Sequence, residues 1–186
     1  MNTITIVTGL PRSGTSLMMQ ILNKSSLPLL IDGVREKDIN NPKGYFELEA
    51  VKKIVKDNSF LIKAQGKAVK IVCPLPMYLD LNLKYRVIVM RRNMQEILSS
   101  QEKMLNKDQS ELKISFSKIY TSHLNKMYDF FNKNKIEHID VWYPDLIENS
   151  DDILDSVIKF CKLENNLKEL KTVISPDLYR NKNEAK

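Results

Sequence analysis

Two glycines near the start of the chain frame the segment best suited to chemistry. The segment runs from Gly9 to Ser16, reads Gly-Leu-Pro-Arg-Ser-Gly-Thr-Ser, and directly follows a short apolar run. A strand that enters a glycine-rich turn and then a helix directs backbone N–H groups and a helix N-terminus at one point, which favours a bound anion. The segment therefore predicts a phosphate-binding loop with the frame G-x-x-x-x-G-K-[ST].

One position of this loop departs from the frame, because Thr15 stands where a lysine is expected. Enzymes that use ATP or GTP need that lysine on the β- and γ-phosphates, together with a magnesium ion on the loop hydroxyl. Arg12 instead places a permanent charge inside the loop, and its guanidinium matches the geometry of a phosphate group. The loop thus predicts phosphate binding but disfavours the usual ATP or GTP chemistry.

A second basic segment closes an apolar run in mid-chain, where Arg91 and Arg92 precede a helical pattern that reaches Ser100. Ligands of an open parallel sheet gather at the carboxyl ends of its strands, and we expect both this arginine pair and the glycine loop there. The alternative for one of the two arginines is a surface ion pair with Glu96 or Glu102, and Arg91 is the candidate for it.

The elements that must position these residues alternate between short β-rich runs and longer helical patterns. This alternation is typical of βαβ units, and it predicts a three-layer α/β/α fold like that of P-loop NTPases, with a parallel sheet of about four to five strands. The expected strands are 3–8, 68–73, 85–90 and 138–143, and the expected helices are 15–22, 48–58, 94–105, 112–131 and 153–161.

Length and composition bound the remaining possibilities. The 186 residues, of which 42% are hydrophobic, predict one domain over 1–186 with a sizeable core. The chain has no long apolar span, and the first strand begins too close to Met1 for a leader peptide, so we expect a cytoplasmic protein without a membrane partner. The formal charge of +6 suits a polyanionic ligand, but the basic residues are dispersed among acids, so nucleic acid is not the expected partner.

Cysteine and histidine give no sign of a metal or nucleophile site. Cys73 and Cys161 lie far apart in apolar runs and form no C-x-x-C pair, so we expect buried hydrophobic side chains rather than a zinc site or a disulfide. His123 falls on the apolar stripe of an expected helix, and His138 begins the last expected strand. We expect structural roles for both histidines.

The two basic segments together resemble the sulfotransferases that use 3′-phosphoadenosine 5′-phosphosulfate (PAPS). The resemblance rests on Pro11-Arg12-Ser13-Gly14-Thr15 and on the strand that ends in Arg92-Asn93, with Ser100 eight positions after the arginine. It extends to residues 141–149 and 160–163, which are similar to the family's late strand, Tyr-Glu-Asp-Leu segment and following helix. The departures are Pro144 for a glutamate, Met94 for a proline, and Cys161-Lys162 for Leu-Gly.

The resemblance implies a role for each residue of these segments. Arg12 would contact the bridging oxygen and the sulfonate of the donor, while Arg92 and Ser100 would bind its 3′-phosphate. A sulfuryl donor has no γ-phosphate, so backbone N–H groups and Arg12 would stabilise the departing phosphate without a metal ion. The loop residues around the 5′-phosphate would be Pro11, Ser13, Gly14, Thr15 and Ser16.

A general base must take the proton from the acceptor hydroxyl or amine. In the glutamate-using relatives of this family the base follows the first helix, which indicates the irregular stretch 25–47 and its acids Asp32, Glu36 and Glu47. We expect Glu36 to act as the base in preference to Asp32, so the expected catalytic residues are Arg12, Glu36 and Asp32.

Two further basic residues follow from the resemblance, each with an alternative. Lys70 resembles a lysine that related enzymes place near the donor phosphates, and the alternative is a charge at a strand edge. Arg180 could fold back onto the 3′-phosphate, and the alternative is a frayed tail.

The sequence therefore predicts a sulfotransferase that moves a sulfuryl group from PAPS to a hydroxyl or amine of a small-molecule or carbohydrate acceptor. Two alternatives stay open: a nucleotide kinase of P-loop architecture, in which the loop arginine partly replaces the lysine, and a nucleotide-binding module that has lost turnover. The sequence leaves the identity of the acceptor and the oligomeric state open.

Overall fold

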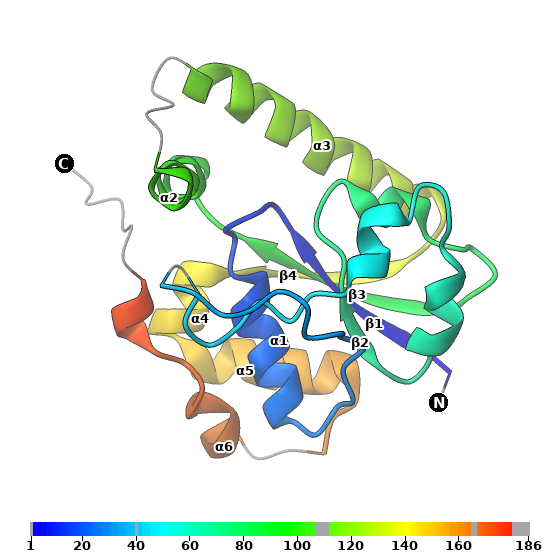
Figure 1. The fold of residues 1–186 in the computed structure, drawn as a ribbon. Helices are drawn as coiled ribbons and strands as arrows, with labels where there is room; N and C mark the ends of the chain where they lie inside the picture. Colours follow the sequence, from blue (N-terminus) through cyan, green and yellow to red (C-terminus); the bar gives the residue numbers. More distant parts are fainter. Residues whose placement is uncertain (1, 40, 107–111, 165–166, 180–186) are drawn as a thin grey trace.

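Four parallel strands form the sheet at the centre of the molecule (Figure 1). The computed structural model describes residues 2–39, 41–106, 112–164 and 167–179. The strands lie in the order β2-β1-β3-β4. The predicted α/β fold around a parallel sheet is therefore confirmed. The strand bounds are β1 (Ile4–Gly9), β2 (Ala68–Lys70), β3 (Tyr85–Arg91) and β4 (Glu137–Trp142).

The two central strands are buried on both faces, as their runs of Val and Ile predict. Successive side chains of a strand point to opposite faces, and β3 divides its residues accordingly. Val87 and Val89 pack into one hydrophobic cluster, whereas Ile88 and Met90 pack into the other. The sheet thus separates two cores, each covered by its own set of helices.

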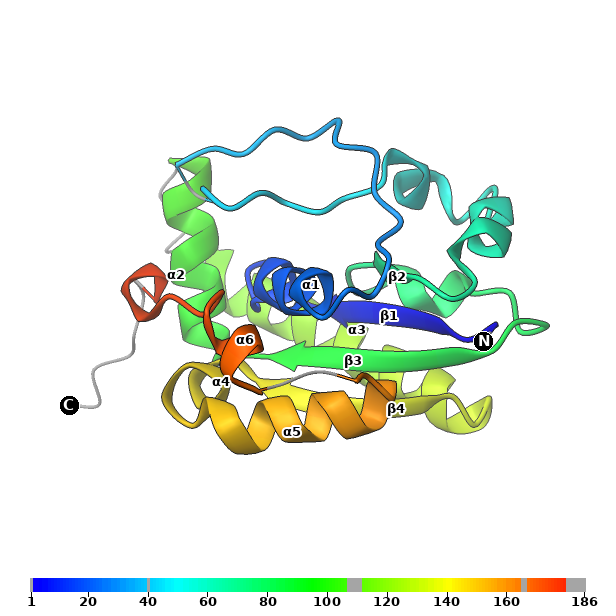
Figure 2. The same ribbon diagram turned by 90° about the horizontal axis from the view of Figure 1, so that it is seen from below.

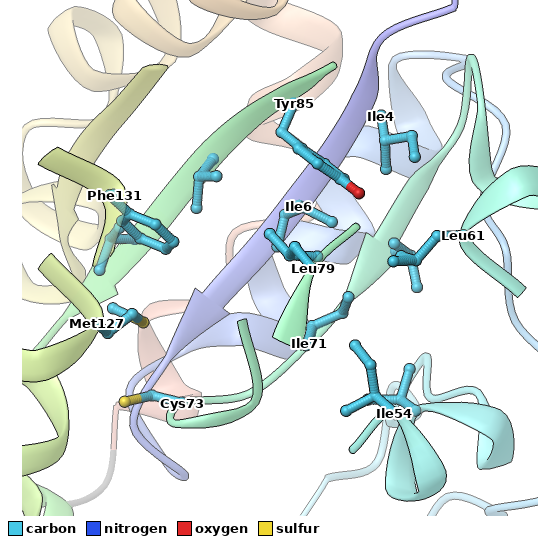
Figure 3. Close-up of a cluster of buried hydrophobic side chains, with 14 of the residues drawn as sticks. Ile4, Ile6, Ile54, Leu61, Ile71, Cys73, Leu79, Tyr85, Met127 and Phe131 are labelled. Carbon is cyan, nitrogen blue, oxygen red and sulfur yellow. The ribbon is translucent and has the colours of Figure 1, made fainter. Parts of the chain in front are cut away.

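The first core lies between the sheet and α3 (Lys113–Lys133), together with three short 3-10 helices, η1 (Glu49–Lys53), η2 (Ser59–Ala64) and η3 (Leu75–Tyr78). Figure 3 shows Met127 and Phe131 of α3 on one side of this cluster and Ile54 and Leu61 on the other. Helices on the other face enclose the second core: α1 (Thr15–Lys24), α4 (Tyr143–Glu148), α5 (Ser150–Cys161) and α6 (Leu167–Lys171).

The helix predicted over residues 48–58 is wrong, because only Glu49–Lys53 is helical there and its geometry is 3-10. Leu48, Val51 and Ile54 all pack against the first core, at a spacing of three residues. A 3-10 helix has three residues per turn and brings such positions onto one face, which an α-helix of 3.6 residues per turn does less well. The spacing of three, read correctly, would have indicated this geometry.

The described residues of the irregular stretch predicted over 25–47 form no helix, and the stretch arches over α1 in light blue to cyan (Figure 2). Its path begins beside the sheet, where Leu29 forms a bridge with Ala68 of β2. The stretch then returns to the carboxyl edge, where α2 (Met94–Leu105) begins within the residues predicted for it. The glycine loop, α2 and the irregular stretch therefore meet at the carboxyl edge of the sheet.

Two smaller predictions concern burial and membrane spans. Cys73 and Cys161 are buried and unpaired, and burial raises the pKa of each thiol to about 12, which confirms that they serve as buried apolar side chains. Within the described ranges, no helix combines the length and the apolar character needed to cross a membrane.

Candidate functional site

The glycine loop connects β1 to α1 and has the conformation of an anion-binding turn. Arg12 adopts a left-handed backbone conformation with φ 69°, and Gly14 follows with φ 101° as the N-cap of α1. A non-glycine residue in this conformation costs on the order of 1 kcal/mol, and such strain concentrates at functional sites. Successive backbone N–H groups in this arrangement form a concave anion-binding surface.

Packing explains why both glycines of the motif are required. A Cβ at Gly9 would clash with the Met90 carbonyl oxygen of β3, and a Cβ at Gly14 would clash with the Tyr143 ring. The first glycine therefore allows the loop to turn against the neighbouring strand. The second lets the start of α1 approach an aromatic ring of α4.

A cavity of about 450 Å³ lies in front of the loop, and we call it the loop cavity. Ser13 is the one predicted binding residue outside its lining, because its side chain is buried beneath the loop against Gly9. The Ser13 hydroxyl has no hydrogen-bond partner among the described residues. The cavity does collect the other predicted binding residues, namely Pro11, Arg12, Gly14, Thr15, Ser16, Arg92 and Ser100.

Arg12 reaches from the loop to α2. Its Nε donates a hydrogen bond to Ser100 Oγ over 3.0 Å, and its Nη1 lies 3.6 Å from Met104 Sδ. A helix rises about 12 Å over eight residues, so spacing alone could not show that Ser100 would meet the residues at the end of β3. The structure brings Arg12, Arg92 and Ser100 to one cavity.

Arg92 is held in a buried ion pair rather than pointing to solvent. Its Nε lies 2.8 Å from Glu96 Oε2, and the two side chains are only 7% and 5% exposed. Its Nη1 donates to the Arg12 carbonyl oxygen over 3.2 Å, which links it to the loop. The alternative of a surface pair between Arg91 and Glu96 or Glu102 is wrong, because Arg91 pairs with Asp140 and the partner of Glu96 is Arg92.

A lysine from β2 occupies the space next to the position where the loop lacks one. Lys70 is buried, and its Nζ lies 3.5 Å from Ser16 Oγ and 3.1 Å from Glu47 Oε1. Nζ also donates to the Tyr45 carbonyl oxygen. Burial lowers the pKa of the Lys70 ammonium group, although the charge of Glu47 opposes this shift. The cavity therefore has a lysine beside the loop, supplied by the neighbouring strand.

Within the described part of the chain, Glu47 is the one acid that lines the loop cavity. Arg35 Nη1 lies 3.0 Å from the same oxygen that Lys70 contacts. Partial burial by itself would raise the pKa of the Glu47 carboxyl, but the charge of Lys70 and the hydrogen bonds from Lys70 and Arg35 lower it overall. Glu47 is therefore ionised and held in place by two cations.

The structure does not bring the two acids favoured from the sequence to this cavity. Glu36 is exposed and lies outside its lining. Asp32 is also exposed, and its carboxylate accepts backbone N–H groups of Val34 and Glu49, which lower its pKa. The geometry favours Glu47 instead. In the sequence, the signal for this position of Glu47 was the aromatic Tyr45 two positions earlier, because a buried ring fixes the adjacent backbone.

Two further segments complete the walls. Asn41 Nδ2 donates to Ser16 Oγ over 2.9 Å, so the irregular stretch touches the loop directly. Lys43 Nζ lies 2.8 Å from the Val173 carbonyl oxygen and 2.6 Å from Ser175 Oγ. The irregular stretch and the chain after α6 are thus joined across the cavity.

The remaining candidates lie elsewhere or outside the described ranges. His123 and His138 do not line the loop cavity. The His138 ring packs 5.5 Å from Phe131, and its Nδ1 donates to the Ile136 carbonyl oxygen over 3.0 Å, in a structural position. Arg180 lies outside the described residues. Among those residues, no three or more His, Cys, Asp or Glu side chains are grouped to hold a metal ion, and metal independence stays a prediction.

Comparison with known proteins gives matches at the level of structure. No protein-family model matches the chain. No curated protein matches it by sequence. The sulfotransferase domain from the curacin biosynthetic pathway superposes with a TM-score of 0.57 at 15% identity, over 96% of this chain and 80% of that one.

Two further structures agree with this match. The sulfotransferase domain from the Synechococcus PCC 7002 olefin synthase gives a TM-score of 0.50 at 13% identity, over 96% of this chain and 79% of that one. Mouse sulfotransferase SULT7A1, complexed with PAP, gives 0.53 at 14% identity, over 93% of this chain and 62% of that one. The chain therefore has the sulfotransferase fold, as the resemblance of its two basic segments predicts.

Proposed function

We propose that this chain transfers a sulfuryl group from PAPS to a hydroxyl or amine of a small-molecule or carbohydrate acceptor. The observation that carries the proposal is the meeting of Arg12, Arg92 and Ser100 with the glycine loop in one cavity. The left-handed turn of the loop suits a 5′-phosphate, and Arg92 and Ser100 line the same cavity, where they would bind the 3′-phosphate. The fold neighbours support it, because all three are sulfotransferases and one was crystallised with PAP.

The charge of the cavity fits such a donor. Among the residues that the structure describes, the lining carries one carboxylate, that of Glu47, and six cationic side chains, which are Arg12, Arg35, Lys43, Lys70, Arg92 and Lys103. Glu96 behind the lining offsets the charge of Arg92. A ligand with phosphate groups at two positions would balance this excess, whereas a neutral ligand would leave the cations close together.

The residues of the cavity suggest how the reaction proceeds. The Glu47 carboxylate accepts the proton of the acceptor, whose oxygen or nitrogen forms a bond to sulfur. The bond between sulfur and the bridging oxygen breaks, and its electron pair goes to the 5′-phosphate. Arg12 and Lys70 stabilise that developing charge together with the N–H groups of the loop. Glu47 suits the role of base by its place in the cavity wall. It is ionised at neutral pH, although its lowered pKa makes it a weaker proton acceptor.

Thermal unfolding with nucleotides tests the donor. Adenosine 3′,5′-bisphosphate should raise the melting temperature without magnesium, and Arg12→Ala should remove most of the effect. The matched control is Arg86→Ala, which changes an arginine near the start of β3, at the opposite edge of the sheet. Stabilisation by ATP with magnesium alone would contradict the proposal and favour a kinase.

Turnover is measured separately, with PAPS and a panel of phenols, amines and monosaccharides as acceptors. Formation of adenosine 3′,5′-bisphosphate that depends on an acceptor would support the transferase. Tight binding of the bisphosphate without turnover on any acceptor would favour the alternative of a binding module.

A further inference from the structure

Tyr179, in the segment that follows α6, is linked to Arg92 of the loop cavity through Glu96. Tyr179 lies just after η5 (Pro176–Leu178), and its hydroxyl lies 2.9 Å and 3.0 Å from the two carboxylate oxygens of Glu96. Glu96 in turn pairs with Arg92 Nε over 2.8 Å. A hydrogen-bonded chain therefore leads from the segment after α6, drawn in red beside α2 in Figure 2, to Arg92.

The ring of Tyr179 acts on the same guanidinium as its hydroxyl does. The Arg92 guanidinium carbon lies 4.8 Å from the centroid of the Tyr143 ring and 5.1 Å from that of the Tyr179 ring. The two rings contact each other edge to face at 5.1 Å. Because a guanidinium is planar with a rigid fork of N–H groups, fixing its faces and its Nε also fixes where its other N–H groups point.

The same segment forms part of the cavity wall. Val173, Ser175 and Leu178 line the loop cavity, and Lys43 bonds to the first two across it. Burial and the hydrogen bond to Glu96 raise the pKa of Tyr179 to about 12, so its hydroxyl remains a donor at neutral pH. The position of residues 172–179 is thus tied to Arg92 at one end and to the irregular stretch at the other.

We propose that Glu96 and Tyr179 are positioning residues for Arg92, and that through them the docking of residues 172–179 is coupled to recognition of the 3′-phosphate. The inference rests on the proposed function, since it takes Arg92 as a ligand of that phosphate. Coupling of this kind is reciprocal. A bound 3′-phosphate should hold the segment in place, and a docked Tyr179 should strengthen binding of the 3′-phosphate.

The first test compares two nucleotides that differ by the 3′-phosphate alone. Calorimetric Kd values for adenosine 3′,5′-bisphosphate and for AMP are measured on the unmodified chain and on Tyr179→Phe and Glu96→Gln. The Kd for AMP divided by the Kd for the bisphosphate should fall about tenfold in each variant, because bisphosphate affinity falls while AMP affinity stays the same. Tenfold is the lower end of the affinity loss caused by substitutions behind metal ligands. A merely structural role would weaken both nucleotides equally.

Tyr85→Phe is the matched control. Tyr85 and Tyr179 are each 8% exposed, and the Tyr85 hydroxyl also donates a partly buried hydrogen bond, over 2.7 Å, to the Asp80 carbonyl oxygen. Tyr85 lies at the start of β3, away from the loop cavity. Its variant should lose thermal stability as Tyr179→Phe does, but keep the full preference for the bisphosphate.

Hydrogen exchange supplies the second readout. The bisphosphate should slow exchange of the backbone amides of residues 172–179 in the unmodified chain, AMP should not, and Tyr179→Phe should lose the effect. If both variants keep the preference for the bisphosphate, the inference is overturned and the proposed function stands. If the unmodified chain binds both nucleotides equally, the proposed function itself fails. Should Glu96→Gln not fold, Tyr179→Phe decides the outcome.

Discussion

Two cavities of similar volume, about 450 and 410 Å³, lie at the carboxyl edge of the sheet, and their linings differ in charge. The second cavity lies between α2 and α3, has Leu10, Met90 and Ile97 among its lining, and we call it the α3 cavity. Both arginines line this cavity, and Arg92 also lines the loop cavity. Arg91 is paired with Asp140 over 2.9 Å and bonded to the Tyr128 hydroxyl over 2.8 Å. Position at this edge does not by itself make a phosphate site.

The adjacent arginines at the end of β3 illustrate the difference. Arg91 belongs to the face that carries Val87 and Val89, so it meets Tyr128 of α3. Arg92 follows the strand and meets Tyr143 and Tyr179, which pack into the other core. Alternation along a strand thus assigns two identical neighbours to different surroundings. Five measurements can break this contrast or sharpen it.

The largest effect should come from a contrast between two of the carboxylates that pair with arginine, Glu47 and Asp140. Glu47→Gln removes the expected base and should lower kcat of sulfuryl transfer at least about 100-fold, whereas Asp140→Asn should leave it nearly unchanged. Because the pKa of Glu47 is lowered from 4.5, the acid limb of the pH profile should lie below pH 4.5. Full turnover of Glu47→Gln would contradict the role of base.

The same carboxylate gives a signed prediction for stability. A group whose pKa is depressed by folding stabilises the native state above its unfolded pKa, and this contribution is lost as the pH falls through the folded value. The free energy of unfolding should therefore decline below about pH 4.5, and Glu47→Gln should flatten that decline. Urea unfolding at several pH values measures it, and an unchanged slope would argue against the pairing with Lys70.

The second contrast compares nucleotide affinity in the two arginine variants. Arg92→Ala should weaken adenosine 3′,5′-bisphosphate on the order of 30-fold, because charge-assisted hydrogen bonds to a phosphate contribute about 2 kcal/mol. Arg91→Ala should change the Kd by no more than about twofold. Isothermal titration of both variants measures the difference, and equal losses would erase the distinction between the two cavities.

A third contrast concerns the free energy of unfolding. Arg92→Ala leaves the Glu96 carboxylate without its buried cation and should cost about 3 kcal/mol. The pair of Arg91 and Asp140 is more exposed, with 27% of the Arg91 side chain accessible, so Arg91→Ala should cost about 1 kcal/mol or less. Urea unfolding tests both, and the double variant Arg92→Met, Glu96→Leu should recover most of the larger loss.

The smallest effect is spectroscopic. Trp142 is the chain's one tryptophan, and the Arg91 guanidinium lies 5.3 Å from its ring centroid. Arg91→Ala should uncover the ring and move its fluorescence emission to longer wavelength, while Arg92→Ala should leave the emission unchanged. A shift in the second variant alone would mean that the assignment of the two arginines is reversed.

Local patterns sufficed for the elements that bear the site. The glycine loop, the order of strand, turn and helix around it, and the bounds of α2 could be read from residues close together in the chain. Ser13 marks a limit of such reading, because a motif names the residue but not the direction of its side chain. The same holds for Glu36 and Asp32, whose irregular stretch has no period that fixes which side chains point inward.

The sequence by itself thus determined a parallel α/β fold with an arginine-bearing phosphate loop, because strand and helix periods and the conformational needs of Gly9 and Gly14 are local. Only the tertiary structure decided how distant residues, including those that the resemblance names, reach that loop. Lys70 reaches Ser16 because β2 lies beside β1, and Tyr179 reaches Glu96 because the chain after α6 returns to α2. Such meetings depend on strand order and packing, which spacing along the chain does not encode.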